Sequence, residues 1–247
     1  MAETLVLKPK TIRMRAFASF GKRQAFPSTA ACALLDKFKP QDGLPGERSL
    51  QVKMGTVHRI DALFASFMNG TNNNEITNAC ECLSKKINYS SKDVEIFSPM
   101  LLAYEQKPSF ERISGLFLSY LVNFGKDSDY VLNLWDISTP IEFLCFVNKK
   151  NLVINGNVGD YLGTWMKQGK IILNGNAGSY VGNGKEGGDI TVNGDVGMAP
   201  AQEQTGGIVR VNGRISELPN KCNAGKLYQR KRLLVENGVF KTWQFNK

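Results

Sequence analysis

The histidine His58 and the nearby carboxylate Asp61 are the residues of this chain whose types best suit acid-base chemistry, and His58 is its one histidine. A histidine oriented by a carboxylate can activate a serine or cysteine nucleophile. Both residues lie in a segment whose apolar spacing predicts a helix, and a surface or cap position is the more frequent fate of such a histidine. We therefore predict no catalytic residue in this chain.

The glycine-rich stretch 182–188 resembles a phosphate-binding loop in composition. However, Lys185 is not followed by serine or threonine, and the spacing to a first glycine does not fit a Walker A motif. We interpret the stretch as the outer loop of a repeat. Asp160, Asp189 and Asp195 lack the local spacing of a calcium-binding loop. The sequence therefore predicts no bound cofactor.

The five cysteines are odd in number and widely scattered, at Cys32, Cys80, Cys82, Cys145 and Cys222. This distribution does not indicate a disulfide framework, and Cys80 and Cys82 have no second pair at zinc-site spacing. No apolar run is long enough to span a membrane, and residues 4–35, although free of acids, read as part of the fold rather than a transit peptide. We predict no metal site and an intracellular, cytoplasmic protein.

The net charge of +9 is concentrated at the two ends of the chain. Residues 1–60 carry eleven basic and four acidic side chains, residues 221–247 carry seven and one, and residues 61–147 carry six and eleven. Basic ends can bind nucleic acid or an acidic partner. The candidate contacts for an anionic partner are Lys226, Arg230, Lys231 and Arg232; we favour the alternative, a charged edge that discourages sheet aggregation.

A repeat of 19 residues runs through 152–215. Each unit holds three β-prone residues, an Asn-Gly pair that suits a turn with positive φ, and further glycines. The repeated turn positions are Asn155, Gly156, Gly159, Gly163, Asn174, Gly175, Gly178, Gly182, Asn193, Gly194, Gly197, Asn212 and Gly213.

Stacked coils explain this repeat better than isolated hairpins, because stacking places equivalent positions directly above one another. The pattern predicts a parallel β-solenoid of about three coils. Tyr161 and Tyr180 should then stack in a column. The repeated asparagines would form an amide ladder or cap turns, and we favour turn capping. The third unit departs from the pattern at 198–201, which suggests a local distortion or the approach of a terminal coil.

The flanking residues must cap the open ends of such a solenoid. Apolar spacing predicts helices over 57–67 and 76–87, a third opened by Pro99 and a fourth capped by Ser109 and ending at Gly125. Residues 130–135 suit a strand, and Thr139-Pro140 suits a short helix. A hairpin is expected around Asn237-Gly238. The predicted class is α+β, with a mainly helical domain 1–148, a β-helix 149–220 and a basic hairpin cap 221–247.

The repeat resembles a known glycine-rich β-helix family. Residues 155–163 read Asn-Gly-Asn-Val-Gly-Asp-Tyr-Leu-Gly, residues 174–182 read Asn-Gly-Asn-Ala-Gly-Ser-Tyr-Val-Gly, and 187–197 continue the pattern. They are similar to the repeat in the C-terminal domain of the glutamate synthase large subunit and in the C subunit of formylmethanofuran dehydrogenase. The resemblance covers 152–215 and implies a right-handed parallel β-helix that supports catalytic domains. It transfers no catalytic residue.

Three classes of function follow from the sequence. The first is a scaffold that docks onto other proteins, and the second is an accessory subunit of a redox or amidotransferase complex. The third is a nucleic-acid-binding protein that uses its basic ends. Self-association through the solenoid is a further expectation.

Overall fold

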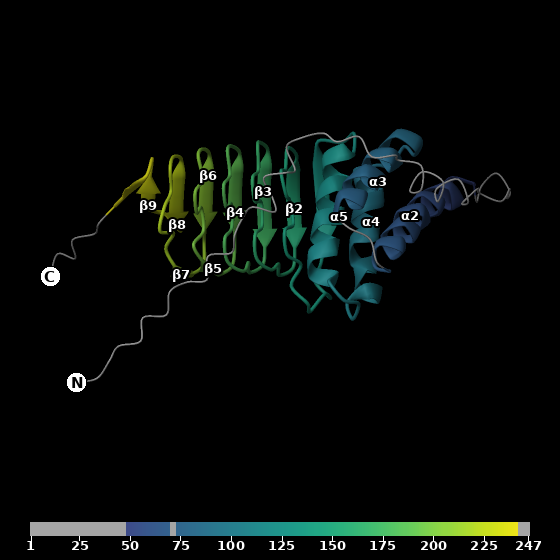
Figure 1. The fold of residues 1–247 in the computed structure, drawn as a ribbon, viewed down its shortest axis with the longest axis horizontal. Coiled ribbons are helices and arrows are strands. Elements are labelled where there is room, and N and C mark those ends of the chain that lie inside the picture. The colour runs from purple at the N-terminus through teal and green to yellow at the C-terminus, as the bar shows by residue number, and fades with distance from the viewer. Residues whose placement is uncertain (1–47, 70–72, 242–247) are drawn as a thin grey trace.

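A computed structural model describes residues 48–69 and 73–241 of the 247-residue chain. Within these residues helices come first and strands follow, which confirms the predicted α+β class. Figure 1 shows the helices stacked at one end of a row of strands. The expectations for residues 4–35 and for Cys32 concern positions outside the described residues.

Two long helices, α2 (Arg48–Phe67) and α3 (Asn73–Lys86), form where the apolar spacing predicted them. The apolar residues that recur at helical spacing in each are buried, namely Val57, Ile60, Phe64 and Phe67 in α2 and Ile76, Ala79, Cys80 and Leu83 in α3. Burial of these stripes explains why the two segments are helical.

Three further helical elements follow: α4 (Ser91–Phe97), the 3₁₀ helix η3 (Ser98–Tyr104) and α5 (Phe110–Phe124). Pro99 stands in the first turn of η3 as predicted, but α4 was not predicted. The sequence signal for the start of α4 is a capping box, in which Ser90 and Asp93 exchange backbone and side-chain hydrogen bonds. Ser109 precedes α5, yet it has a left-handed φ of 60° and makes no capping hydrogen bond.

An aromatic core holds the helices together and against the first strand. Phe64 contacts Phe97 and Phe117 with ring centroids 5.8 and 5.1 Å apart. Helix α4 packs on β1 (Asp129–Asn133), and the Asn133 backbone N–H donates to Ser98 Oγ at 2.9 Å. The helices therefore cover the end of the solenoid that would otherwise expose unpaired backbone groups.

The solenoid consists of six parallel strands in one sheet: β1, β2 (Asn151–Asn155), β3 (Lys170–Asn174), β4 (Asp189–Val192), β6 (Ile208–Val211) and β8 (Lys226–Gln229). Paired residues in successive strands are 22, 19, 19, 19 and 18 positions apart. The solenoid thus has about five coils rather than the three predicted. Its first and last coils lack the 19-residue spacing on which that prediction depended.

A second side of the solenoid carries the short parallel strands β5 (Val196–Met198) and β7 (Ile215–Glu217). Residues 198–201 continue this side without distortion, because Ala199 and Ala201 have φ values of 54° and 62°, like Tyr180 at 63° in the preceding coil. The departure from the repeat at these residues therefore changes the side chains and not the backbone.

The prediction of a short helix after Thr139-Pro140 is wrong. Residues 139–148 form the turning side of the first coil, with left-handed φ values of 56°, 61° and 53° at Phe143, Cys145 and Val147. Such alternation is incompatible with a right-handed helix.

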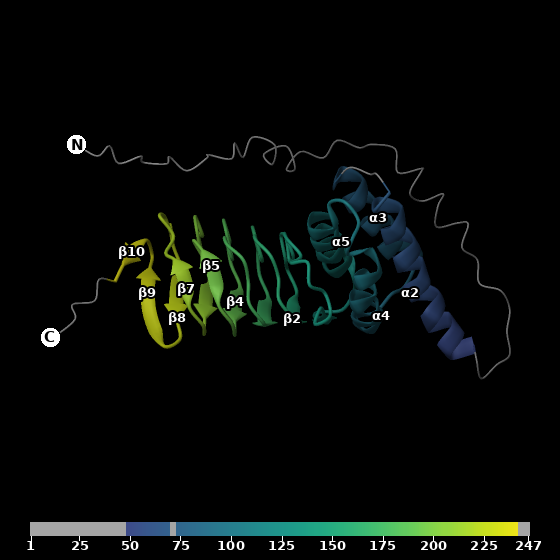
Figure 2. The same cartoon turned by 90° about the horizontal axis from the view of Figure 1, so that it is seen from below.

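The predicted C-terminal hairpin is confirmed. Strand β9 (Arg232–Glu236) pairs antiparallel with β8 and with β10 (Val239–Phe240), and Asn237 and Gly238 turn with φ values of 47° and 78°. Figure 2 shows this hairpin at the end of the solenoid opposite the helices.

Candidate interaction surfaces

The repeated asparagines at the ends of β1, β2, β3, β4 and β6 form an amide ladder, which corrects the expectation that they cap turns. Each side-chain amide donates to the Oδ1 of the asparagine one coil earlier, at 2.7–2.9 Å. The ladder consists of Asn133, Asn155, Asn174, Asn193 and Asn212. An amide has a donor and an acceptor on opposite sides, so it can bond to both neighbours in a stack.

Turn capping is instead performed by the residue two positions further on. Asn157 Oδ1 accepts the backbone N–H of Asn176 at 2.9 Å, and Asn176 Oδ1 accepts that of Asp195 at 2.8 Å. Asp195 Oδ1 in turn accepts the N–H of Arg214 at 2.8 Å. The second polar residue of each Asn-Gly-Asn or Asn-Gly-Asp turn therefore satisfies a backbone donor that the turn of the next coil leaves unpaired.

We expect Asn174→Ala to lower the free energy of unfolding by about 1–2 kcal/mol, because it removes two side-chain hydrogen bonds of the ladder. The same change at Asn212, which makes one side-chain hydrogen bond at the end of the ladder, should cost about half as much. Urea denaturation of both variants checks this. Equal losses would show that the amide bonds contribute nothing specific.

The glycines of the Asn-Gly pairs are required by close packing more than by positive φ. Of the four, Gly156 has a left-handed φ of 120°, whereas Gly175, Gly194 and Gly213 do not adopt positive φ. A Cβ at these three positions would lie 2.0–2.5 Å from a carbonyl oxygen of the preceding coil. At Gly163 and Gly182, by contrast, φ values of 68° and 67° favour glycine directly.

The outer face of the long sheet is a candidate docking surface, which we call the long-sheet face. Its central row is half-exposed and follows the strand register, with one residue from each strand: Val131, Val153, Ile172, Thr191, Arg210 and Tyr228. Beside the first three lies a groove of about 330 Å³ whose lining includes Asp129, Asn151 and Lys170. The face is apolar near the helices and basic near the hairpin.

The four predicted anion contacts lie at the basic end, on β8, its turn and the start of β9. Lys226 forms an ion pair with Glu236 at 3.1 Å, which raises the pKa of Lys226 and lowers that of Glu236. Arg230 Nε donates to the Asn212 carbonyl at 3.3 Å, while Lys231 and Arg232 are exposed. The structure therefore already uses Lys226 and Arg230 in contacts within the chain.

Arg210 was not singled out from the sequence, although it lies on the same surface. Its guanidinium lies 4.8 Å from the ring centroid of Tyr228. This cation-π contact holds the guanidinium over the long-sheet face while its N–H groups can still bind an acceptor. Side chains alternate between the two faces of a strand, so the apolar neighbours of Arg210 in 208–211 could have predicted from the sequence that Arg210 points outward.

The candidate acid-base pair is not assembled as a catalytic site. His58 is exposed on α2, while Asp61 Oδ1 accepts a hydrogen bond from the Tyr104 hydroxyl at 2.9 Å. Burial, together with this bond, raises the pKa of Tyr104 to about 12. Asp61 thus fastens η3 to α2.

Lys185 corrects the interpretation of 182–188 as an outer loop, because its side chain is fully buried in the solenoid. The ammonium donates to the carbonyls of Gly188 at 2.9 Å and Gly206 at 2.6 Å. Burial lowers the pKa of Lys185 to about 8. In the next coil the buried amide of Gln204 has no hydrogen-bond partner of ordinary geometry within the described residues.

The cysteines among the described residues do not gather at a reactive site. Cys80, Cys145 and Cys222 are buried free thiols, and burial raises the pKa of each. Cys82 is disulfide-bonded, although one bridge does not make a disulfide framework. Across residues 48–69 and 73–241, no cluster of histidine, cysteine and acidic side chains is arranged to hold a metal ion. In the same residues no helix has the length and apolar character needed to cross a membrane.

These features define a parallel β-solenoid capped by helices at one end and by a hairpin at the other. Comparison of the chain with family models, curated proteins and solved structures finds no match. The similarity to the glycine-rich repeat of glutamate synthase therefore stays a prediction from the repeat residues.

Proposed function

We propose that this protein is a scaffold that binds a protein partner along its long-sheet face. The observation that carries the proposal is the row of half-exposed aliphatic side chains, Val131, Val153 and Ile172, beside the groove on β1–β3. An aliphatic row held on a rigid, fully hydrogen-bonded sheet binds a partner with little loss of conformational entropy.

The chemistry of this face indicates an apolar and acidic partner. Val153 and Ile172 offer aliphatic surface, and about 40 Å² of it buried on binding contributes roughly 1 kcal/mol. Arg210 lies two coils beyond Ile172 in the direction of the hairpin, and Arg230 lies three coils beyond it. A partner segment with apolar side chains at one end and carboxylates at the other would match both halves of the surface.

The test uses the full chain purified from its own cells together with whatever binds it stoichiometrically. Ile172→Glu and Arg210→Glu should each weaken capture of the same protein by at least tenfold, since each places a charge that opposes one half of the interface. Two matched variants on the helical cap should retain it: Leu102→Glu, at a residue 46% exposed, and Lys85→Glu, at a side chain 71% exposed.

Equal capture by all four variants would overturn the long-sheet face as the docking surface. If nucleic acid is recovered instead and is released by salt, the basic ends carry the function and the scaffold proposal fails. A partner with redox or amidotransferase activity would identify this chain as an accessory subunit, which is the second function expected from the sequence.

A further inference from the structure

An aromatic column lies on a different side of the solenoid from the long-sheet face. Phe143, Tyr161 and Tyr180 stack with centroids 4.7 and 5.1 Å apart and planes within 8° of parallel. All three have left-handed φ values, between 56° and 66°. This confirms the predicted column of Tyr161 and Tyr180 and extends it by one ring.

The two ends of the column differ. At the end near the helices the guanidinium of Arg112 lies 5.8 Å from the Phe143 ring centroid. At the other end the next equivalent residue is Ala199, which keeps the same backbone: the Tyr180 N–H donates to the Met198 carbonyl at 2.8 Å, and the Ala199 N–H to the Glu217 carbonyl at 2.9 Å. The backbone at Ala199 thus continues the column, but its side chain supplies no ring.

One coil beyond Ala199, the equivalent residue Leu218 is 43% exposed. Tyr180 and Leu218 are thus two coils apart, and two strand spacings amount to about 9.6 Å. A planar group between them would lie about 4.8 Å from each, close to the separation of the rings that already stack. The column therefore lacks one ring at Ala199, a residue only 9% exposed, and we call the place of that ring the slot.

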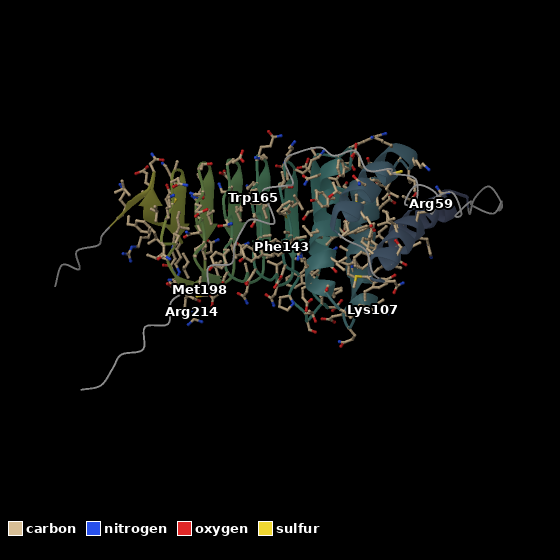
Figure 3. The ribbon with its side chains drawn as sticks, viewed as in Figure 1. Arg59, Lys107, Phe143, Trp165, Met198 and Arg214 are labelled. Carbon is tan, nitrogen blue, oxygen red and sulfur yellow. The ribbon has the colours of Figure 1, made fainter. Side chains whose placement is uncertain are left out.

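We propose that this slot receives an aromatic side chain of a protein partner, as a second anchor that adds to the proposed scaffold function and rests on it. Met198, which precedes Ala199, is 46% exposed, and methionine sulfur makes favourable contacts with rings. Figure 3 places Met198 and Arg214 on the same edge of the solenoid. Arg214 is ion-paired with Asp195 at 3.1 Å, and Glu217 is exposed, so this edge suits a phosphate poorly.

The slot can be tested without the natural partner. We expect N-acetyl-L-tryptophanamide to bind the ¹³C-labelled full chain at millimolar concentrations and to shift the methyl resonances of Ala199 and Leu218 in a saturable way. Ala199→Tyr should abolish these shifts at Leu218, because a fourth ring fills the slot on a backbone that Tyr161 and Tyr180 already adopt. Trp135→Ala, which removes a residue 65% exposed elsewhere on the surface, should leave them unchanged.

A second variant keeps the test decisive if Ala199→Tyr folds poorly: Tyr180→Ala removes the ring on which the probe stacks and should weaken its binding at least fivefold. Shifts that persist in both variants, or no saturable shift in the unmodified chain, would overturn the slot. Binding of adenosine monophosphate in preference to the tryptophan derivative would overturn the assignment to a protein side chain. None of these outcomes depends on the long-sheet face, so the two proposals fail separately.

Discussion

Gly175→Ala is expected to lower the free energy of unfolding by about 3 kcal/mol. The added Cβ would lie 2.0 Å from the carbonyl oxygen of Gly156 and 2.6 Å from its carbonyl carbon. Both atoms belong to the backbone of the preceding coil, which is hydrogen-bonded on either side and cannot rotate away as a side chain would. Relief therefore requires two coils to separate.

Gly55→Ala is the matched control, because Gly55 lies within α2 and a Cβ there meets no atom within 4 Å. Alanine should raise the free energy of unfolding by about 0.5–1 kcal/mol, since glycine is the poorer helix former. Chemical denaturation of both variants gives the comparison. A loss below about 1 kcal/mol for Gly175→Ala would show that the coils are spaced more loosely than the structure indicates.

The central coils could be predicted because stacking repeats the same chemical requirement every 19 residues. Asn155, Asn174 and Asn193 recur because each bonds to the one before it, and Gly175 and Gly194 recur because the coil beneath leaves no room for a side chain. Such requirements leave a visible pattern in the sequence.

The terminal coils could not be predicted, because their neighbours are not coils. The first coil packs on α4 and α5, where Gly115 closely approaches the Glu142 carbonyl, so its side chains fit the helices rather than the repeat. In the last coil strand β8 ends at Gln229, whereas the equivalent position in β2, β3, β4 and β6 is Ile, Leu or Val followed by Asn-Gly. The separate roles of the two polar residues that flank glycine in these turns were also not predicted, because asparagine can both form a ladder and cap a turn.

Candidate surfaces were harder to predict than the fold. Arg210 and Ala199 gain their significance from neighbours 18 and 19 residues away, Tyr228 and Tyr180. Neither has a local motif. A missing ring is informative only after the column that should contain it is established.

Lys185→Ala is expected to lower the free energy of unfolding by about 3–4 kcal/mol, whereas Lys185→Met should be tolerated. Alanine leaves a cavity in the solenoid where three methylene groups and an ammonium were packed. Methionine has a similar length, and Met166 fills the equivalent buried position one coil earlier. The Gly188 carbonyl would still accept the Ile208 N–H at 3.2 Å. Thermal and urea unfolding of the two variants at pH 7 checks this difference.

The pH dependence of the same variants separates the charge of Lys185 from its volume. Its pKa is about 8 in the folded chain against an ordinary value of 10.5. Between these values the unfolded chain binds more protons than the folded chain, so the free energy of unfolding should rise with pH across this window, by roughly 3 kcal/mol in total. Below pH 8 both states are protonated, and the full cost of burying the ammonium persists.

Lys185→Met should lack this rise and match or exceed the stability of the unmodified chain at pH 7. An equal rise in both proteins would assign the titration to another group, and a large loss for Lys185→Met at pH 7 would show that the bonds to Gly188 and Gly206 outweigh the desolvation of the ammonium.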